Sequence, residues 1–212
     1  MSKEKHLDDL AQIRSIMERS QKYLSLSPWA AVMAGVYALT GASIAYVLIP
    51  DLFNHFTNAV VLTSGKLWVL FSLAMSILVL ATLSTLALNS RQARKNGGQL
   101  WTKAARRLAS NFVLPMLAGG LFIFALWLHT YYSLIPAAML LFYGLSLINA
   151  GNFTFSDVRI LGVFQTVLGL GAAFWPNTGL WWWAMGFGWL HVIYGWWLFQ
   201  KLKAAKSMTK LI

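Results

Sequence analysis

LWWWAMGFGWLHVIYGWWLF, residues 180–199, is the stretch of sequence that decides the fold class of this chain. The run contains no Asp, Glu, Lys or Arg, and its length matches the ~20 residues that a helix needs to cross the roughly 30 Å hydrocarbon core of a bilayer. One ionisable residue, His191, stands in its middle, with Gly188 and Gly195 about one turn away on either side. Because an ionisable side chain is costly in hydrocarbon, we expect His191 to face protein and treat it as a candidate functional residue.

The composition extends this interpretation to the whole chain. Of its 212 residues, 58% are hydrophobic, 15% aromatic and 11% charged, which would leave a soluble domain with large exposed apolar patches. We therefore expect an all-α, polytopic membrane helix bundle with six transmembrane helices. The predicted spans, which together make a transmembrane domain over residues 28–199, are 28–49, 66–88, 111–129, 133–150, 157–175 and 180–199.

The distribution of cations predicts the orientation of the bundle. Lysines and arginines concentrate in the N-terminal segment 1–27, in the loop from Arg91 to Arg107 and in the basic tail 200–212. These three regions share one side of a six-span topology, and the positive-inside rule places that side, with both termini, in the cytoplasm. We interpret the net charge of +11 as a topology signal, with membrane lipids and their anionic headgroups as partners rather than nucleic acid.

The segment before the first span predicts an amphipathic helix. Its face repeats at helical spacing through His6, Leu10, Ile13 and Met17. Such a helix lies on the inner membrane surface or docks on a cytoplasmic protein partner. Ser27 and Pro28 are the expected N-cap and first helical residue of span one.

A layer of polar residues is predicted near the middle of the bundle. With a rise of ~1.5 Å per residue, His191 lies roughly 16 Å below the outer edge. The other residues at similar depth are Tyr37, Thr40, Ser76, Tyr143 and Gln165, with Tyr194 following on the helix of His191. Two interpretations stay open: a structural network of interhelical hydrogen bonds worth about 0.6–2 kcal/mol each, or a site for a substrate, ion or cofactor.

The polar turn between spans four and five is a second candidate site. Ser156 is the expected N-cap of span five, and Asp157 is favoured by the helix dipole in its first turn. Asp157 and Arg159 are two residues apart and do not face each other, so each pairs elsewhere or meets water. A gate or docking point is the alternative to a purely structural turn. The residues of this cytoplasmic turn that we single out are Asn149, Asn152, Asp157 and Arg159.

Four stretches carry a resemblance to a known family. They are Arg19–Gly35 (RSQKYLSLSPWAAVMAG), Phe142–Ala150 (FYGLSLINA), Val158–Gly162 (VRILG) and Gly186–Gly195 (GFGWLHVIYG). As an ordered set they resemble a family of uncharacterised bacterial six-span integral membrane proteins. The resemblance implies a multi-pass protein of the bacterial inner membrane and draws attention to His191 and Tyr194. It implies no reaction, and Gly151-Asn152 departs from the Ser-Lys that is commoner in that family.

The chemistry of the spans argues against an enzyme. The sequence has no cysteine, no intramembrane pair of acids, no HExxH-type metal motif and no phosphate-binding glycine loop. We expect no metal and no resident cofactor, although a haem or a quinone beside His191 stays open. A bis-histidine haem is disfavoured because His129 falls near the outer edge while His191 falls near the centre.

Two function classes follow from the sequence. The first, which we favour, is a non-enzymatic scaffold or sensor that binds lipid or ligand and signals to a cytoplasmic partner. The second is a small-solute transporter or channel with His191 in a central polar cavity. Against transport, the spans carry no acid for ion coupling and no clear inverted repeat. The sequence leaves a homo-oligomer open.

Overall fold

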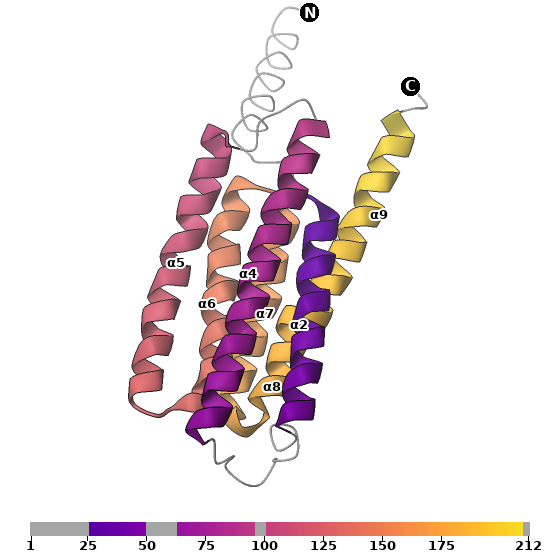
Figure 1. Cartoon of the computed structure of the whole chain (residues 1–212). Coiled ribbons are helices and arrows are strands. Elements are labelled where there is room, and N and C mark those ends of the chain that lie inside the picture. Colours follow the sequence, from indigo (N-terminus) through magenta and orange to yellow (C-terminus); the bar gives the residue numbers. More distant parts are fainter. Residues whose placement is uncertain (1–25, 50–62, 96–100, 210–212) are drawn as a thin grey trace, which may run out of the picture.

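The computed structural model describes residues 26–49, 63–95 and 101–209, and in these ranges the chain is all-helical (Figure 1). The prediction of an all-α bundle is therefore confirmed. The predicted amphipathic helix over residues 1–27 lies outside the described residues, apart from its last two positions. Ser27 is the N-cap of the first described helix and Pro28 its first residue, although the Ser27 side chain makes no capping hydrogen bond.

Five segments are long and apolar enough to cross a membrane, which supports a membrane protein. Four of them are single helices, each close to its predicted span or longer, and the fifth is the segment that contains α6. The five, with the helix labels of Figure 1, are α2 (Pro28–Leu48), α4 (Ser64–Lys95), α5 (Lys103–Leu128), α6 (Ile135–Ala150, within the segment Tyr132–Phe153) and α7 (Ser156–Phe174).

Two helices extend beyond the predicted spans at the same end of the bundle. α4 continues to Lys95, and its last turn carries Arg94 and Lys95, where cations are favoured by the helix dipole. α5 begins at Lys103, so the polar stretch before residue 111 is part of the helix. Thr102 caps α5, with its hydroxyl oxygen accepting from the N–H of Ala105 at 3.1 Å.

The sixth predicted span is not one regular α-helix. It consists of the short helix α8 (Gly179–Trp183), a π-helical segment, η4 (Ala184–Leu190), and the helix α9 (His191–Thr209). π-helical turns are rare and concentrate at functional sites. Hydropathy and helical spacing alone gave no indication of this change in winding.

Small residues bring the helices of the centre into close contact. A Cβ atom at Gly162 would lie 2.7 Å from the carbonyl oxygen of Gly144, so α6 and α7 touch through their backbones. Similarly, a Cβ at Gly35 of α2 would lie 2.7 Å from the carbonyl oxygen of Gly188. Close approach through small residues is how helices associate where lipid supplies no hydrophobic drive. On α7, Gly162, Thr166 and Gly169 line the contact with α6, whereas Ala173 is exposed.

Helix α4 is attached differently from the others. It packs mainly on α2, where Ile77 lies over Gly41, and the carboxamide oxygen of Asn89 accepts from the backbone N–H of Ser27 at 2.8 Å. Yet none of the residues in its most apolar 18-residue window is buried, against 44% of those in the segment that contains α6. α4 is therefore a peripheral helix that presents most of its apolar surface outward.

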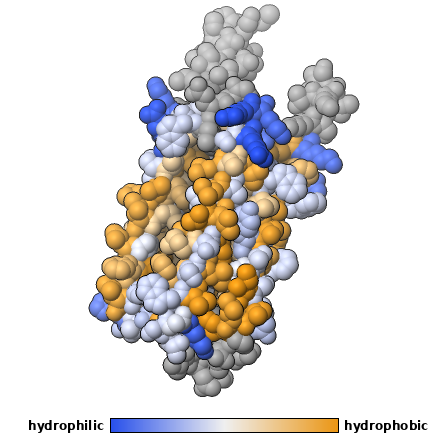
Figure 2. Space-filling view, viewed as in Figure 1, coloured by the Kyte–Doolittle hydropathy of each residue, from blue (hydrophilic) through white to orange (hydrophobic). Residues whose placement is uncertain are grey.

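Charge gathers at one end of the bundle. Figure 2 shows hydrophilic residues at the end where α9 terminates and an apolar belt below them. We call this the cationic end; its lysines and arginines with described side chains are Arg91, Arg94, Lys95, Lys103, Arg106, Arg107, Arg159, Lys201 and Lys203. Lys66 lies at the opposite end, in the first turn of α4.

Candidate functional site

His191 is the centre of the polar layer, and both of its ring nitrogens are engaged. Its side chain is 4% exposed, with Nε2 2.9 Å from the hydroxyl oxygen of Tyr143 and Nδ1 2.9 Å from the carbonyl oxygen of Gly186. Because a carbonyl can only accept, Nδ1 carries the proton. In the neutral ring Nε2 is then an acceptor, and the Tyr143 hydroxyl donates to it. The structure thus brings together two of the residues that depth alone had grouped.

The π-helical segment supplies the carbonyl that holds the ring. The backbone N–H of His191 bonds to Gly188, while the carbonyl of Gly186, five residues before the histidine, receives the ring N–H. Gly186 also needs to lack a side chain, because a Cβ there would meet Leu140 and lie 3.1 Å from Oε1 of Gln165. The local winding and the glycine together fix the orientation of the imidazole.

Two phenylalanine rings pack against the hydrogen-bonded pair of Tyr143 and His191. Phe187 stacks on His191 with a centroid distance of 6.1 Å and an interplanar angle of 17°, and lies 5.1 Å from the ring of Tyr143. Phe112 of α5 meets Tyr143 edge-on at 5.8 Å. We did not predict Phe112 or Phe187 from the sequence. The contact of Phe187 with His191 could have been predicted, because residues four apart on a helix lie next to each other.

Two buried polar groups in the same region have no hydrogen-bond partner among the described residues. They are the carboxamide of Gln165, whose side chain is fully buried, and the hydroxyl of Tyr194. Gln165 adjoins Gly186, and Tyr194 packs on the same apolar cluster as Tyr143. Leaving such a group unpaired costs about 1–3 kcal/mol, so this is where a polar ligand would gain most from binding.

The structure does not bring the remaining residues of the predicted layer to His191. The hydroxyls of Thr40 and Ser76 bond to carbonyls of their own helices, at 2.9 Å to Val36 and 2.8 Å to Ser72, and both residues are exposed. Tyr37 is half-buried on α2, and no hydrogen bond joins it to the layer within the described ranges. Depth along a helix was sufficient to group these residues, but their rotation about the helix axis sends them elsewhere.

The turn between α6 and α7 holds helices together. Asp157 is buried, and its Oδ2 lies 2.6 Å from Nζ of Lys201 on α9. Asn149 donates to the carbonyl of Asn111 on α5 at 2.9 Å, and Asn152 donates to the carbonyl of Asn149 at 3.3 Å. Arg159 is exposed, with its backbone against Gly151.

One prediction about this turn is wrong. The N-cap of α7 is Phe155, and Ser156, the expected cap, is already the first helical residue. The extended backbone of Phe155 (φ −61°, ψ 134°) starts the helix one residue early, without a side-chain capping bond. Asp157 therefore sits one position further into the first turn, where it meets Lys201.

The geometry bears on the cofactors that the sequence left open. An axial haem ligand would need a free lone pair on the imidazole, but Nδ1 is bonded to Gly186 and Nε2 to Tyr143. Phe187 covers the ring face. His191 in this arrangement therefore does not fit a haem-ligand role. In the described ranges no group of three His, Cys, Asp or Glu residues is placed to hold a metal ion.

Comparisons with known proteins add no further constraint. No family model matches the chain, and no curated protein or solved structure is similar to it. The family resemblance of the four sequence stretches therefore stays a prediction, and function has to be inferred from the described residues themselves.

Proposed function

We propose that this chain is a non-enzymatic, multi-pass membrane scaffold or sensor that binds a membrane lipid beside helix α4. The observation that carries the proposal is the contrast between a close-packed centre and a peripheral α4. The most apolar window of α4 has no buried residue, whereas α6 and α7 meet through backbone atoms at Gly144 and Gly162. A binding surface belongs where side chains still lack protein neighbours.

The closed geometry of the centre supports a framework role for His191. Both ring nitrogens have partners, and the surrounding rings leave the imidazole 4% exposed. Buried hydrogen bonds that engage both ring nitrogens hold the imidazole in one orientation and favour a single packing arrangement around it. A rigid centre suits a scaffold whose responsive part is the peripheral helix.

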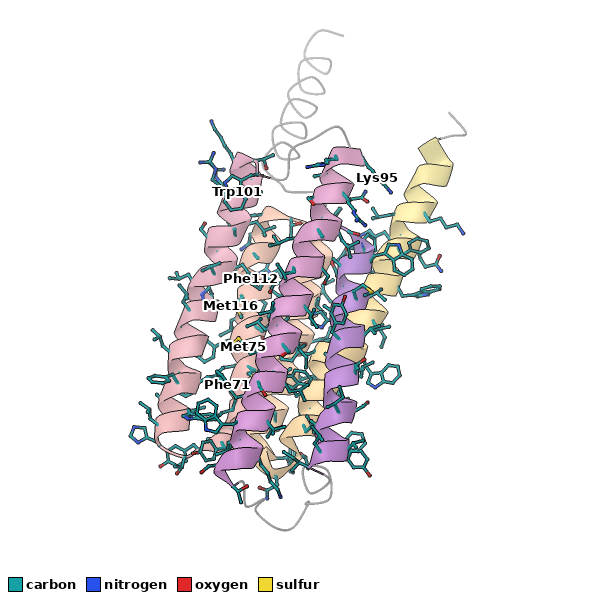
Figure 3. All side chains as sticks on the ribbon, viewed as in Figure 1. Phe71, Met75, Lys95, Trp101, Phe112 and Met116 are labelled. Carbon is teal, nitrogen blue, oxygen red and sulfur yellow. The ribbon has the colours of Figure 1, made fainter. Side chains whose placement is uncertain are left out.

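Side chains between α4 and α5 support lipid as the ligand. Phe71 and Met75 of α4 and Phe112 and Met116 of α5 occupy the sides of the two helices that face each other in Figure 3, and we call these four residues the α4–α5 face. Phe71 is 46% and Met75 43% exposed. Methionine is flexible and polarizable, which suits it to an irregular apolar ligand such as an acyl chain.

The proposed setting is the bacterial inner membrane, with six spans and both termini in the cytoplasm. The nine described cations of the cationic end support this orientation by the positive-inside rule. In this arrangement the cationic end and the N-terminal segment would face a cytoplasmic protein partner. Movement of α4 on lipid binding would be the signal.

Lipid retention tests the proposal. The full chain is purified in mild detergent, and bound lipid is counted by native mass spectrometry. Met75→Trp and Met116→Trp, which fill the α4–α5 face, should each lower the retained lipid severalfold. Leu121→Trp, on the strongly exposed surface of α5, is the matched control and should leave it unchanged. Equal retention in all three variants would contradict a lipid site on this face.

Transport of a small solute is the second candidate, and one observation favours it. The Gln165 carboxamide and the Tyr194 hydroxyl are buried without partners, as expected for groups that contact a polar solute in transit. Reconstitution in vesicles separates the two functions. Solute flux that is lost in Gln165→Leu and kept in Met75→Trp would favour transport over the lipid-binding scaffold.

A further inference from the structure

We infer that the lipid bound at the α4–α5 face is an anionic phospholipid whose phosphate lies between the end of α4 and the start of α5, at Lys95, Lys103 and Arg106. This inference rests on the proposed function and adds the class of headgroup. It rests on two observations. Cations without a described acidic partner lie at one end of α4 and α5, and apolar side chains follow along both helices.

The cations on these two helix ends are exposed and have no acidic neighbour among the described residues. Three belong to the last turns of α4 and three to the first turns of α5: Arg91, Arg94, Lys95, Lys103, Arg106 and Arg107. The one acid in the described ranges, Asp157, is buried and bound to Lys201 on α9. Six positive charges that no described carboxylate balances make a strong attraction for an anionic headgroup.

Helix stability does not account for the cations of α5. Cations are favourable in the last turn of a helix, which explains Arg94 and Lys95, but are unfavourable in the first turn. α5 nevertheless begins with Lys103 and has no acid in its first turn. An anionic headgroup beside this first turn would offset the unfavourable interaction between these cations and the helix dipole.

Trp101 marks the depth of the headgroup. It is 62% exposed and lies directly before Thr102, the N-cap of α5; Figure 3 shows it at the same end as Lys95. Tryptophan is enriched at the headgroup level because its ring is apolar and its N–H is polar. Lys95, Trp101 and Lys103 therefore belong to the layer in which a lipid phosphate lies.

The α5 half of the face has the length of one leaflet. From Arg106 to Met116 the helical rise is about 15 Å, half of the ~30 Å hydrocarbon core. Beyond this point α4 and α5 are joined by rings, with Trp127 lying 6.0 Å from Phe71 and 6.1 Å from Trp68. An acyl chain that starts at the cationic end thus lies along Phe112 and Met116, whereas Met75, about 30 Å of helical rise from Lys95, belongs to the far half of the core.

Native mass spectrometry of the full chain tests the headgroup class. Phosphatidylglycerol and phosphatidylcholine with identical acyl chains are added to the detergent-solubilised protein, and the bound fraction of each is measured. We expect phosphatidylglycerol to bind several times more tightly. Lys103→Gln should weaken phosphatidylglycerol binding about fivefold, the effect of one cation near a lipid surface, and leave phosphatidylcholine binding unchanged.

Lys203→Gln is the matched control, since it removes one exposed cation from the same end but on α9. An equal effect of Lys103→Gln and Lys203→Gln would overturn the site, because only the overall charge would then matter. Equal binding of the two lipids, still sensitive to Met116→Trp, would overturn the headgroup inference and leave the proposed function standing. Absence of any lipid sensitive to Met116→Trp would overturn both.

Discussion

Phe112 of α5 meets Tyr143 of α6 edge-on, with ring centroids 5.8 Å apart and an interplanar angle of 88°. Phe112 belongs to the α4–α5 face, and Tyr143 donates the hydrogen bond that holds His191. One ring contact therefore separates the proposed lipid surface from the central polar layer. Aromatic pairs in this geometry contribute about 0.5–1.5 kcal/mol beyond the area that they bury.

Phe112→Leu should weaken the coupling between the lipid face and the core. Added phosphatidylglycerol is expected to raise the midpoint of thermal unfolding in the native protein, because a ligand that binds the folded state stabilises it. In Phe112→Leu that increase should shrink, since the leucine loses the edge-on contact with Tyr143. Phe122→Leu, which removes a ring from the next part of α5 that contacts Phe142, is the control. An undiminished increase in Phe112→Leu would argue against this contact as the link.

Tyr143→Phe should destabilise the protein by about 1–3 kcal/mol, because Nε2 of His191 would stay buried without its donor. The measurement is reversible unfolding in detergent. Tyr131→Phe, at a 58% exposed tyrosine, should change stability by much less. Equal effects of the two substitutions would mean that the buried hydrogen bond contributes nothing specific.

Gly186→Ala should destabilise the bundle because the added methyl group meets Leu140 and the Gln165 carboxamide. Gly120→Ala on α5 is a matched substitution, since a Cβ there has nothing within 4 Å. It should be neutral or stabilising by up to about 1 kcal/mol, the usual gain of alanine over glycine in a helix. Thermal unfolding of the pair gives the comparison, and a well-tolerated Gly186→Ala would contradict the tight packing around the π-helical segment.

Lys201→Met should cost more stability than Asp157→Asn. The first substitution leaves the buried Asp157 carboxylate without its cation, whereas the second leaves a lysine whose side chain is 50% exposed and can be hydrated. We expect a loss of about 1–3 kcal/mol for Lys201→Met by chemical unfolding. Lys203→Met provides the baseline for removal of a cation from α9. The opposite order would show that Asp157 is not the vulnerable partner.

Gln165→Leu distinguishes an unpaired amide from one that serves a ligand. If the carboxamide makes no hydrogen bond in the working protein, leucine should raise the unfolding free energy by about 1–3 kcal/mol, since the buried polar group is removed. The same variant should keep its full lipid content. A fall in stability together with loss of a copurifying polar molecule would instead support the transport candidate.

How far the sequence predicts this structure depends on the kind of information each feature needs. The spans follow from hydropathy, which is a local property, and the similar depth of His191 and Tyr143 follows from counting residues from the span ends, because helices rise at a constant rate. Thr40 and Ser76 failed to join the layer because depth carries no information about rotation around the helix. Lys201 and Asp157 are 44 residues apart, and nothing in the local sequence of either selects the other.

The chemistry of the site was less accessible than its depth. The tautomer of His191 depends on the carbonyl of Gly186, which is available to the ring through the π-helical winding of Ala184–Leu190. Glycines within the run allow close packing in either winding, so they do not distinguish an α-helix from a π-helix. The peripheral position of α4 was equally hidden, because its hydropathy is that of any span.

The π-helical segment also sets the rotation of α9 about its axis relative to α8. Each added or removed residue turns the helix that follows by about 100°. The face of α9 directed at α6 and α7 carries His191, Tyr194 and Lys201, and its alignment depends on the number of residues wound between Ala184 and Leu190. A one-residue deletion there would leave the hydropathy of the run almost unchanged, but it would rotate this face of α9 away from α6 and α7. What makes the last helix specific is thus its residue count as much as its composition.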